Sequence, residues 1–119
     1  MNHRRVGRIL KRKKGPRKAL LQSLARAVVL RRAITTPEAK AKEMRPQLER
    51  LITKEKSGTL ANHRLVVAAI GSDAARELKN KIIPKLSGRS SGYLRITKMG
   101  VRKSDASRMA HVSFVDTLS

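Results

Sequence analysis

The chain has 119 residues, of which 29 are Lys or Arg and only 8 are Asp or Glu, giving a formal net charge of +21. This length suits one domain, and a compact domain with this charge repels itself and gains stability beside a polyanion. The absence of Trp, Cys and any long apolar run argues against membrane anchoring and excludes a disulfide framework and thiolate zinc sites.

Residues 1–15 are predicted to be a basic arm. Its few apolar side chains bury too little surface to offset an ordering cost of about 1–2 kcal/mol per residue. The arm is either a solvated tail or an extension that becomes ordered on RNA. The absence of acidic residues through residue 18 favours the second interpretation. The candidate RNA-binding residues here and at the start of the first helix are His3, Arg4, Arg5, Arg8, Lys11, Arg12, Lys13, Lys14, Arg17 and Lys18.

A globular domain is predicted over residues 16–119. Apolar residues at three- and four-residue spacing predict a first helix from Pro16 to about Arg32. Ala33–Thr35 is predicted as a short strand because two of its residues are β-branched. A second helix is expected to begin with Thr36 as its cap, to be kinked by Pro46, and to end at Ser57-Gly58.

Two shorter helices are expected to follow. The first runs from about Leu60 to Ile70 and stops at Gly71, and its nearly continuous apolar run predicts burial on most sides. The second begins at Ser72, which is expected to cap it, and ends at Pro84. A basic link over residues 87–92 then leads into the last part of the chain.

The segments 93–98 and 109–115 alternate with a period of two, which predicts a β-hairpin with a long basic loop. The predicted core face carries Leu94, Ile96, Val112 and Phe114. The opposite face is expected to carry Tyr93 together with Arg95 and Thr97. The candidate RNA-binding residues of this region are Arg89, Tyr93, Arg95, Lys98, Arg102 and Lys103.

The sequence predicts no enzyme. The histidines are far apart, no carboxylate pair suggests acid–base catalysis, and the glycine-rich stretch 88–92 lacks the ending of a phosphate loop. We therefore expect no cofactor, no metal and no small-molecule substrate, and interpret His63 as an exposed or RNA-facing residue. With one Tyr and one Phe, the chain must recognise nucleic acid mainly through phosphates, 2′-hydroxyls and shape.

Two motifs carry a family resemblance. The C-terminal one is Tyr93-x-Arg95-Ile96-x-Lys98-x-Gly100-x-Arg102, followed by Asp105, Met109-Ala110 and Val115-Asp116. The N-terminal one is His3-Arg4-x-x-Gly7-Arg8-x-Leu10-x-Arg12. Together they resemble the bacterial large-subunit ribosomal protein seventeen family over nearly the whole chain. Departures from the family pattern occur at Asn2, Ser91-Gly92, Ser104-Asp105 and Ser113-Phe114, and they leave the loop geometry and the source organism open.

The resemblance implies an α+β fold: a single small domain of about four helices packed on a short mixed three-stranded sheet, with the arm extended from it. It also implies a structural constituent of the large ribosomal subunit in the cytoplasm. Its partners would be large-subunit ribosomal RNA and neighbouring ribosomal proteins near the exit side of the peptide tunnel. Charge alone also permits a free nucleoid- or chromatin-type protein, although no helix-turn-helix spacing or zipper seam stands out.

Overall fold

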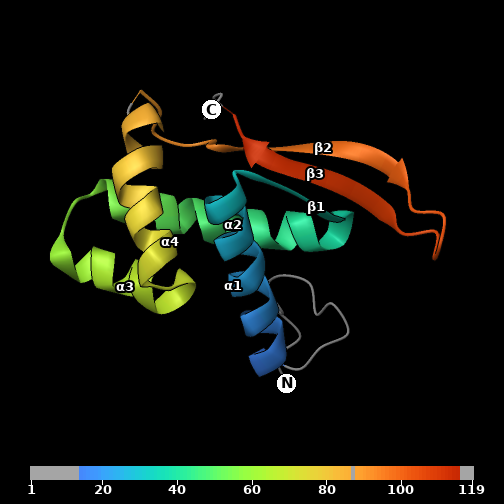
Figure 1. Cartoon of the computed structure of the whole chain (residues 1–119), viewed down its shortest axis with the longest axis horizontal. Helices are drawn as coiled ribbons and strands as arrows, with labels where there is room; N and C mark the ends of the chain where they lie inside the picture. The colour runs from blue at the N-terminus through green and yellow to red at the C-terminus, as the bar shows by residue number, and fades with distance from the viewer. Residues whose placement is uncertain (1–13, 87, 116–119) are drawn as a thin grey trace, which may run out of the picture.

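The computed structural model describes residues 14–86 and 88–115, and the fold is an α+β domain (Figure 1). Most of the predicted arm, including His3 to Lys13, lies outside these residues. The elements in chain order are α1 (Lys14–Arg31), β1 (Ala33–Pro37), α2 (Glu38–Lys56), α3 (Leu60–Ile70), α4 (Ser72–Glu77), a π-helical segment (Leu78–Ile82), a 3-10 turn (Ile83–Leu86), β2 (Leu94–Val101) and β3 (Arg108–Phe114). The predicted order of helices and strands is confirmed.

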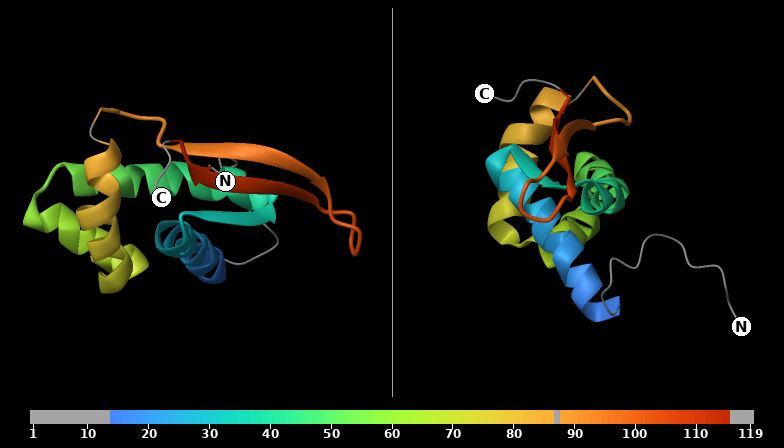
Figure 2. Two further views of the ribbon diagram at one scale, coloured as in Figure 1. Left: turned by 45° about the horizontal axis from the view of Figure 1, so that its top comes forward. Right: turned by 90° about the vertical axis from the view of Figure 1, so that its right-hand side faces the viewer.

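The three strands form one antiparallel sheet in the order β1-β3-β2. The expectation of a mixed sheet is wrong, because both strand pairings are antiparallel. β1 and β2 run in the same direction, but β3 lies between them, so each pairs only with an antiparallel neighbour. One cross-strand row joins Ile34, Val112 and Ile96. The helices lie on one side of the sheet, and the distal hairpin extends beyond them (Figures 1 and 2).

The core lies between that face of the sheet and the helices. Leu94, Val112 and Phe114 are buried in one cluster with Met44 and Leu48 of α2, and Ile96 packs against it partly buried. The predicted core face of the hairpin is therefore confirmed. The cluster also includes apolar residues from α1, α3 and the segment after α4, namely Leu21, Val28, Val29, Val66, Ile70, Leu78, Ile82 and Leu86.

Gly71 ends α3 with a φ of 90°, a conformation that favours glycine. A Cβ at this position would lie 2.7 Å from Nη1 of Arg26, so the glycine also makes room for that side chain. The Arg26 guanidinium donates to the carbonyl of Ile70 at 2.8 Å and to both carboxylate oxygens of Asp73 at 2.5 and 2.6 Å. Arg26 thereby fixes α1 to the junction of α3 and α4.

Several details of the helices differ from the predictions. Thr36 is buried in β1 and does not cap α2, whose N-cap is Pro37 without a side-chain cap bond. The last helix changes to π-helical geometry at Leu78, and Pro84 falls inside the 3-10 turn that follows. α2 includes Pro46 within one continuous helix, and the kink expected at this residue stays a prediction. Thr59 caps α3, because its hydroxyl oxygen accepts from the Asn62 N–H at 3.2 Å.

The ion pair between Arg26 and Asp73 predicts how stability depends on acid pH. The hydrogen bond from Arg26, assisted by the Ala74 N–H, lowers the pKa of Asp73 from 3.8 to about 2. Because the folded-state pKa lies below the unfolded value, the contribution is complete above about pH 4 and is lost as pH falls through about 2. Urea unfolding at several pH values should therefore give Asp73→Asn a shallower loss of unfolding free energy between pH 4 and 2 than the wild type.

The control for this prediction is the range from about pH 5 to 7, where Asp73 is ionised in both the folded and the unfolded state. There, the difference in unfolding free energy between the wild type and Asp73→Asn should be constant. Parallel curves through the acid range would show that Asp73 is not linked to folding.

Candidate nucleic-acid interface

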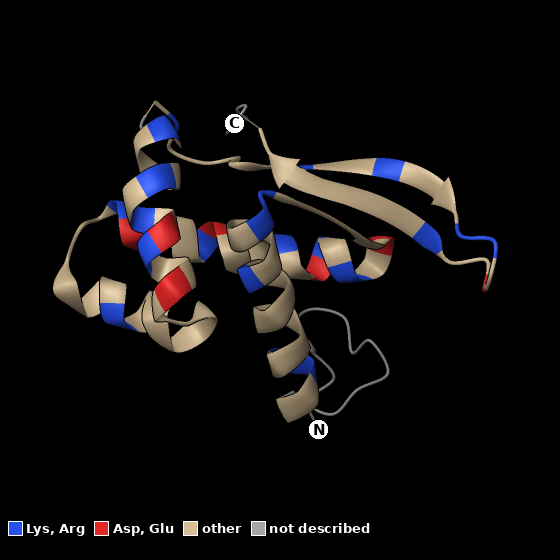
Figure 3. Ribbon diagram, viewed as in Figure 1, with Lys and Arg blue, Asp and Glu red and all other residues tan. Residues whose placement is uncertain are grey.

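Most acidic side chains that the structure describes are engaged in ion pairs. Asp73 pairs with Arg26, Glu77 with Arg32 and Lys81, Glu38 with Lys42, Glu49 with Arg45, and Asp105 with Arg102, while Glu55 is hydrogen-bonded to His63. The acids are few, so many Lys and Arg side chains remain exposed on the helices and the hairpin (Figure 3). The folded domain thus presents a surface with a large excess of positive charge.

The predicted RNA-binding residues in the described part of the chain do not form one patch. Arg17 and Lys18 lie in the first turns of α1, at the end of that helix opposite to the one that leads into β1 (Figure 1). The side chain of Lys14 lies outside the described residues. Arg89 is exposed just before the hairpin. The cations therefore lie on separate parts of the domain: α1, the link before β2 and the hairpin.

The two strand cations project from opposite faces of β2. Arg95 pairs with Ser113 on the face without helices, where Thr35, His111 and Thr97 form the neighbouring row. Lys98 has the same parity as Leu94 and Ile96, but it lies beyond the core and is exposed near Glu38, whose pKa it helps to lower. Arg95 and Lys98 can therefore contact different parts of a partner that surrounds the hairpin.

The loop at the hairpin tip is held by side-chain and backbone hydrogen bonds. The Arg102 guanidinium donates to both oxygens of Asp105 at 2.9 and 2.5 Å, and Asp105 also accepts from the Ser107 N–H at 3.1 Å. Backbone bonds between residues 102 and 107 and between 106 and 102 close the loop. The Arg102 hydrogen bond holds the pKa of Asp105 well below its usual range. Arg102 is thus partly neutralised and fixes the loop, whereas Lys103 projects without an ion pair to the described residues.

The prediction that Tyr93 lies on an exposed face with Arg95 is wrong. β2 begins only at Leu94, and Tyr93 is 1% exposed. The ammonium of Lys56 lies 5.1 Å from the ring centroid, a cation–π distance, and it also donates to the carbonyls of Leu86 and Arg89. Tyr93 therefore anchors the base of the hairpin to α2 and cannot stack on a base.

His63 was expected to be exposed or to face RNA, but it is half-buried against α2. Its Nδ1 lies 2.7 Å from Oε1 of Glu55, whose side chain is 1% exposed. Sequence reasoning missed this pair because the two residues lie on different helices. The contact joins α2 to α3 and serves the fold rather than the interface.

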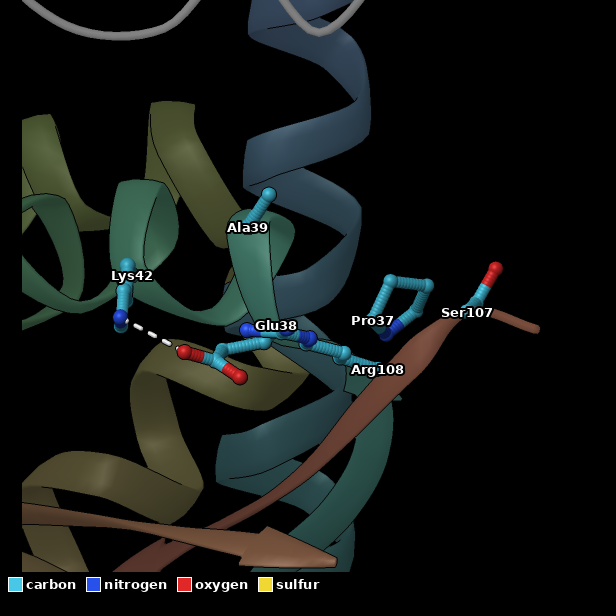
Figure 4. Close-up of a pocket in the computed structure, with 6 residues that line it drawn as sticks. All are labelled: Pro37, Glu38, Ala39, Lys42, Ser107 and Arg108. Atoms are coloured by element: carbon cyan, nitrogen blue, oxygen red, sulfur yellow. Dashed lines mark ion pairs between the residues drawn. The ribbon is translucent and has the colours of Figure 1, made fainter. Parts of the chain in front are cut away.

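A hollow lies where β3 begins beside the start of α2. It has a volume of about 370 Å³ and is lined by Pro37, Glu38, Ala39, Lys42, Ser107 and Arg108 (Figure 4). Glu38 pairs with Lys42 at 2.7 Å, and that hydrogen bond, together with nearby Lys98 and Arg108, lowers the pKa of the carboxyl. An ionised, paired carboxylate at a helix N-terminus stabilises the helix, and its lowered pKa is the opposite of what a general acid requires.

No group of three or more His, Asp or Glu side chains that could hold a metal ion occurs in the described residues. Within the same residues, none of the helices has the length and apolar character needed to cross a membrane. The arrangement is one of dispersed cations on a rigid scaffold, which suits contact with an extended polyanion.

Comparison with known proteins gives a consistent result. The family model described as Ribosomal protein L17 matches residues 20–115. A protein of Aliarcobacter butzleri named large ribosomal subunit protein bL17 is 43% identical over 116 residues, covering 97% of this chain and 100% of that protein. Proteins of the same name from Gemmatimonas aurantiaca and Methylacidiphilum infernorum are 42% and 43% identical, covering 97% and 98% of this chain and 98% and 89% of their own lengths.

Proposed function

The chain belongs to the ribosomal protein L17 family, and from this membership we propose that it binds and stabilises large-subunit ribosomal RNA near the exit side of the peptide tunnel. Membership of the family itself makes the chain a structural constituent of the large ribosomal subunit. The proposal also places the chain in cytoplasmic ribosomes, with neighbouring ribosomal proteins as further partners.

One observation carries the proposal for RNA. The hairpin extends beyond the helices (Figure 3), the bonds from Arg102 to Asp105 hold its end loop, and its exposed cations lie on both faces of β2. Such a projection can enter a groove between RNA helices and replace counterions there. We propose Arg89, Arg95, Lys98, Arg102 and Lys103 as contacts of this region, with Tyr93 excluded because it is buried.

The same mechanism assigns separate tasks to the two parts of the chain. Residues 1–15 form the RNA-binding arm of the proposal, continued by Arg17 and Lys18 on α1, and residues 16–119 form the globular part. The arm contains a high density of cations and almost no apolar surface, so its binding is electrostatic. The folded part fixes the relative placement of the cations it carries, so it can recognise RNA shape.

Co-sedimentation tests the proposal as a whole. Tagged protein expressed in bacteria should sediment with large ribosomal subunits in sucrose gradients, and it should be released as salt increases because the contacts are ionic. The sedimentation of small subunits in the same gradient is the control. Recovery with chromosomal DNA, and not with large subunits, would support a nucleoid-type protein instead.

A prediction for the hairpin tip follows from its geometry. Lys103→Ala should reduce the salt slope of RNA binding by up to about 0.9, the value for one phosphate contact, and Arg102→Ala plus Lys103→Ala by at most about two. The double variant should also discriminate less well between the cognate ribosomal RNA fragment and unrelated duplex RNA, because Arg102 holds the loop shape.

Fluorescence anisotropy titrations of both RNAs at several salt concentrations measure the slope and the discrimination together. Asp105→Ala is the informative companion, since it removes the loop clamp and leaves both cations in place. If Asp105→Ala discriminates as well as the wild type, the fixed loop does not contribute to recognition.

A further inference from the structure

A groove lies between α2 and the link that leads into β2. One wall carries Pro46, Glu49, Arg50, Thr53 and Lys54 of α2, and the other is the backbone and side chains of residues 91–93. Its volume is about 440 Å³, within the range of roughly 300–1,000 Å³ for small-molecule sites, and its exposed lining is mostly apolar. Two facing walls with an apolar lining suit a flat ligand.

The charge around the groove favours an anionic ligand. Arg50 is exposed on the lining and Lys54 lies four residues further along α2. Arg89, whose Nη1 lies 3.5 Å from the Gly92 carbonyl, places a third cation next to a residue of the opposite wall. The lining carboxylate, Glu49, accepts from the Leu94 N–H at 3.2 Å and lies 3.9 Å from Nε of Arg45. The carboxylate is thus engaged in the fold, whereas Arg50 and Lys54 line the groove as cations.

We propose that this groove binds one unpaired nucleotide of RNA, with its base between the two walls and its phosphates beside Arg50 and Lys54. This inference rests on the proposed RNA-binding function and assigns a specific site to it. The Tyr93 ring is 1% exposed and its face is occupied by Lys56, so stacking would come from the Arg50 guanidinium and the Pro46 ring. The Ser91 hydroxyl, on the second wall, can bond to a base edge.

An unpaired nucleotide fits this groove better than a protein side chain does. An apolar side chain would gain nothing from the cations that line the groove, and those cations would lose hydration when covered. A nucleotide uses both features, because its base is planar and weakly polar while its phosphates are charged. An acidic peptide is the remaining alternative, and the experiment includes it.

The test uses the full chain and two RNA duplexes that differ by one bulged nucleotide. The wild type should bind the bulged duplex about fivefold more tightly than the paired one, the lower end of what one stacked base contributes. Thr53→Phe, which fills the groove from an exposed helical position, should bind both duplexes equally and match the wild type on the paired one. Ala68→Phe, which introduces the same ring at an exposed position of α3, should keep the preference.

Equal wild-type affinity for the two duplexes would overturn the inference, as would a preference that persists in Thr53→Phe. The amide NMR signals of Thr53, Ser91 and Gly92 give a second measurement that needs no variant: they should shift with the bulged duplex and not with the paired one. Shifts produced instead by an acidic peptide would also overturn it. If the protein binds both duplexes tightly and equally and co-sediments with large subunits, the groove site is rejected and the proposed function is retained. If it does not co-sediment with large subunits, the proposed function itself is rejected.

Discussion

Phe114→Ala is expected to lower the free energy of unfolding by about 3–5 kcal/mol, the usual cost of removing a buried aromatic ring. Phe114 is 6% exposed and pairs across the sheet with the buried Leu94, in the cluster that joins the hairpin to α2. A small domain has only about 5–15 kcal/mol of stability in total. The variant should therefore be marginally folded or unfolded at ambient temperature.

Ser113→Ala is the matched control, since Ser113 is the neighbouring residue and lies on the opposite face of β3. It should change the unfolding free energy by no more than about 0.5 kcal/mol. Urea denaturation followed by circular dichroism measures both variants. Comparable losses at the two positions would contradict this sheet register, because shifting a strand by one residue exchanges its two faces.

The strands could be predicted from sequence because their signal is local. Alternation with a period of two identifies the buried face of a strand wherever one side of a sheet is covered, and Leu94, Val112 and Phe114 follow it. The helices could be predicted for the same reason, from apolar spacing and from Gly71. The strand order could not, because which edge of the hairpin receives β1 depends on how α1 packs against the rest of the chain.

Tyr93 illustrates where alternation fails. The alternating pattern includes Tyr93, but the chain turns at Gly92, where φ is 67°, and β2 begins only at Leu94, the residue after Tyr93. The ring is then directed beneath Lys56, a residue 37 positions earlier in the sequence. No feature of the neighbouring sequence distinguishes a tyrosine at the start of a strand from one that precedes the strand and packs into the core.

The same reason applies to the charged residues of the candidate site. Composition predicts an excess of cations, but which of them are neutralised depends on tertiary pairs such as Arg26 with Asp73 and Arg32 with Glu77. Other pairs, such as Arg102 with Asp105 and Glu38 with Lys42, are local, and their spacing of three or four residues could have been noticed in the sequence. The groove beside α2 has no sequence signature, since its walls come from segments about 40 residues apart.

Deleting residues 1–13 is expected to reduce the salt slope of ribosomal RNA binding by several units. The deletion ends where α1 begins, at Lys14, and removes Arg4, Arg5, Arg8, Lys11, Arg12 and Lys13. Each cation that neutralises a phosphate contributes up to roughly 0.9 to the slope, so six contacts would contribute about five. Replacing both Arg102 and Lys103 can lower the salt slope by at most about two. The arm is therefore expected to contribute more to the slope than the hairpin tip does.

Titrations of the cognate ribosomal RNA fragment and of an unrelated duplex RNA, each at several salt concentrations, measure this effect. A full-length variant with the six arm cations changed to Gln separates charge from chain length and should match the deletion. Both should weaken binding to the two RNAs about equally, because phosphate contacts carry no sequence or shape information whereas a fixed loop recognises shape. If the slope is unchanged after the deletion, the arm is a solvated tail, and RNA affinity must then come from the exposed cations of the folded domain.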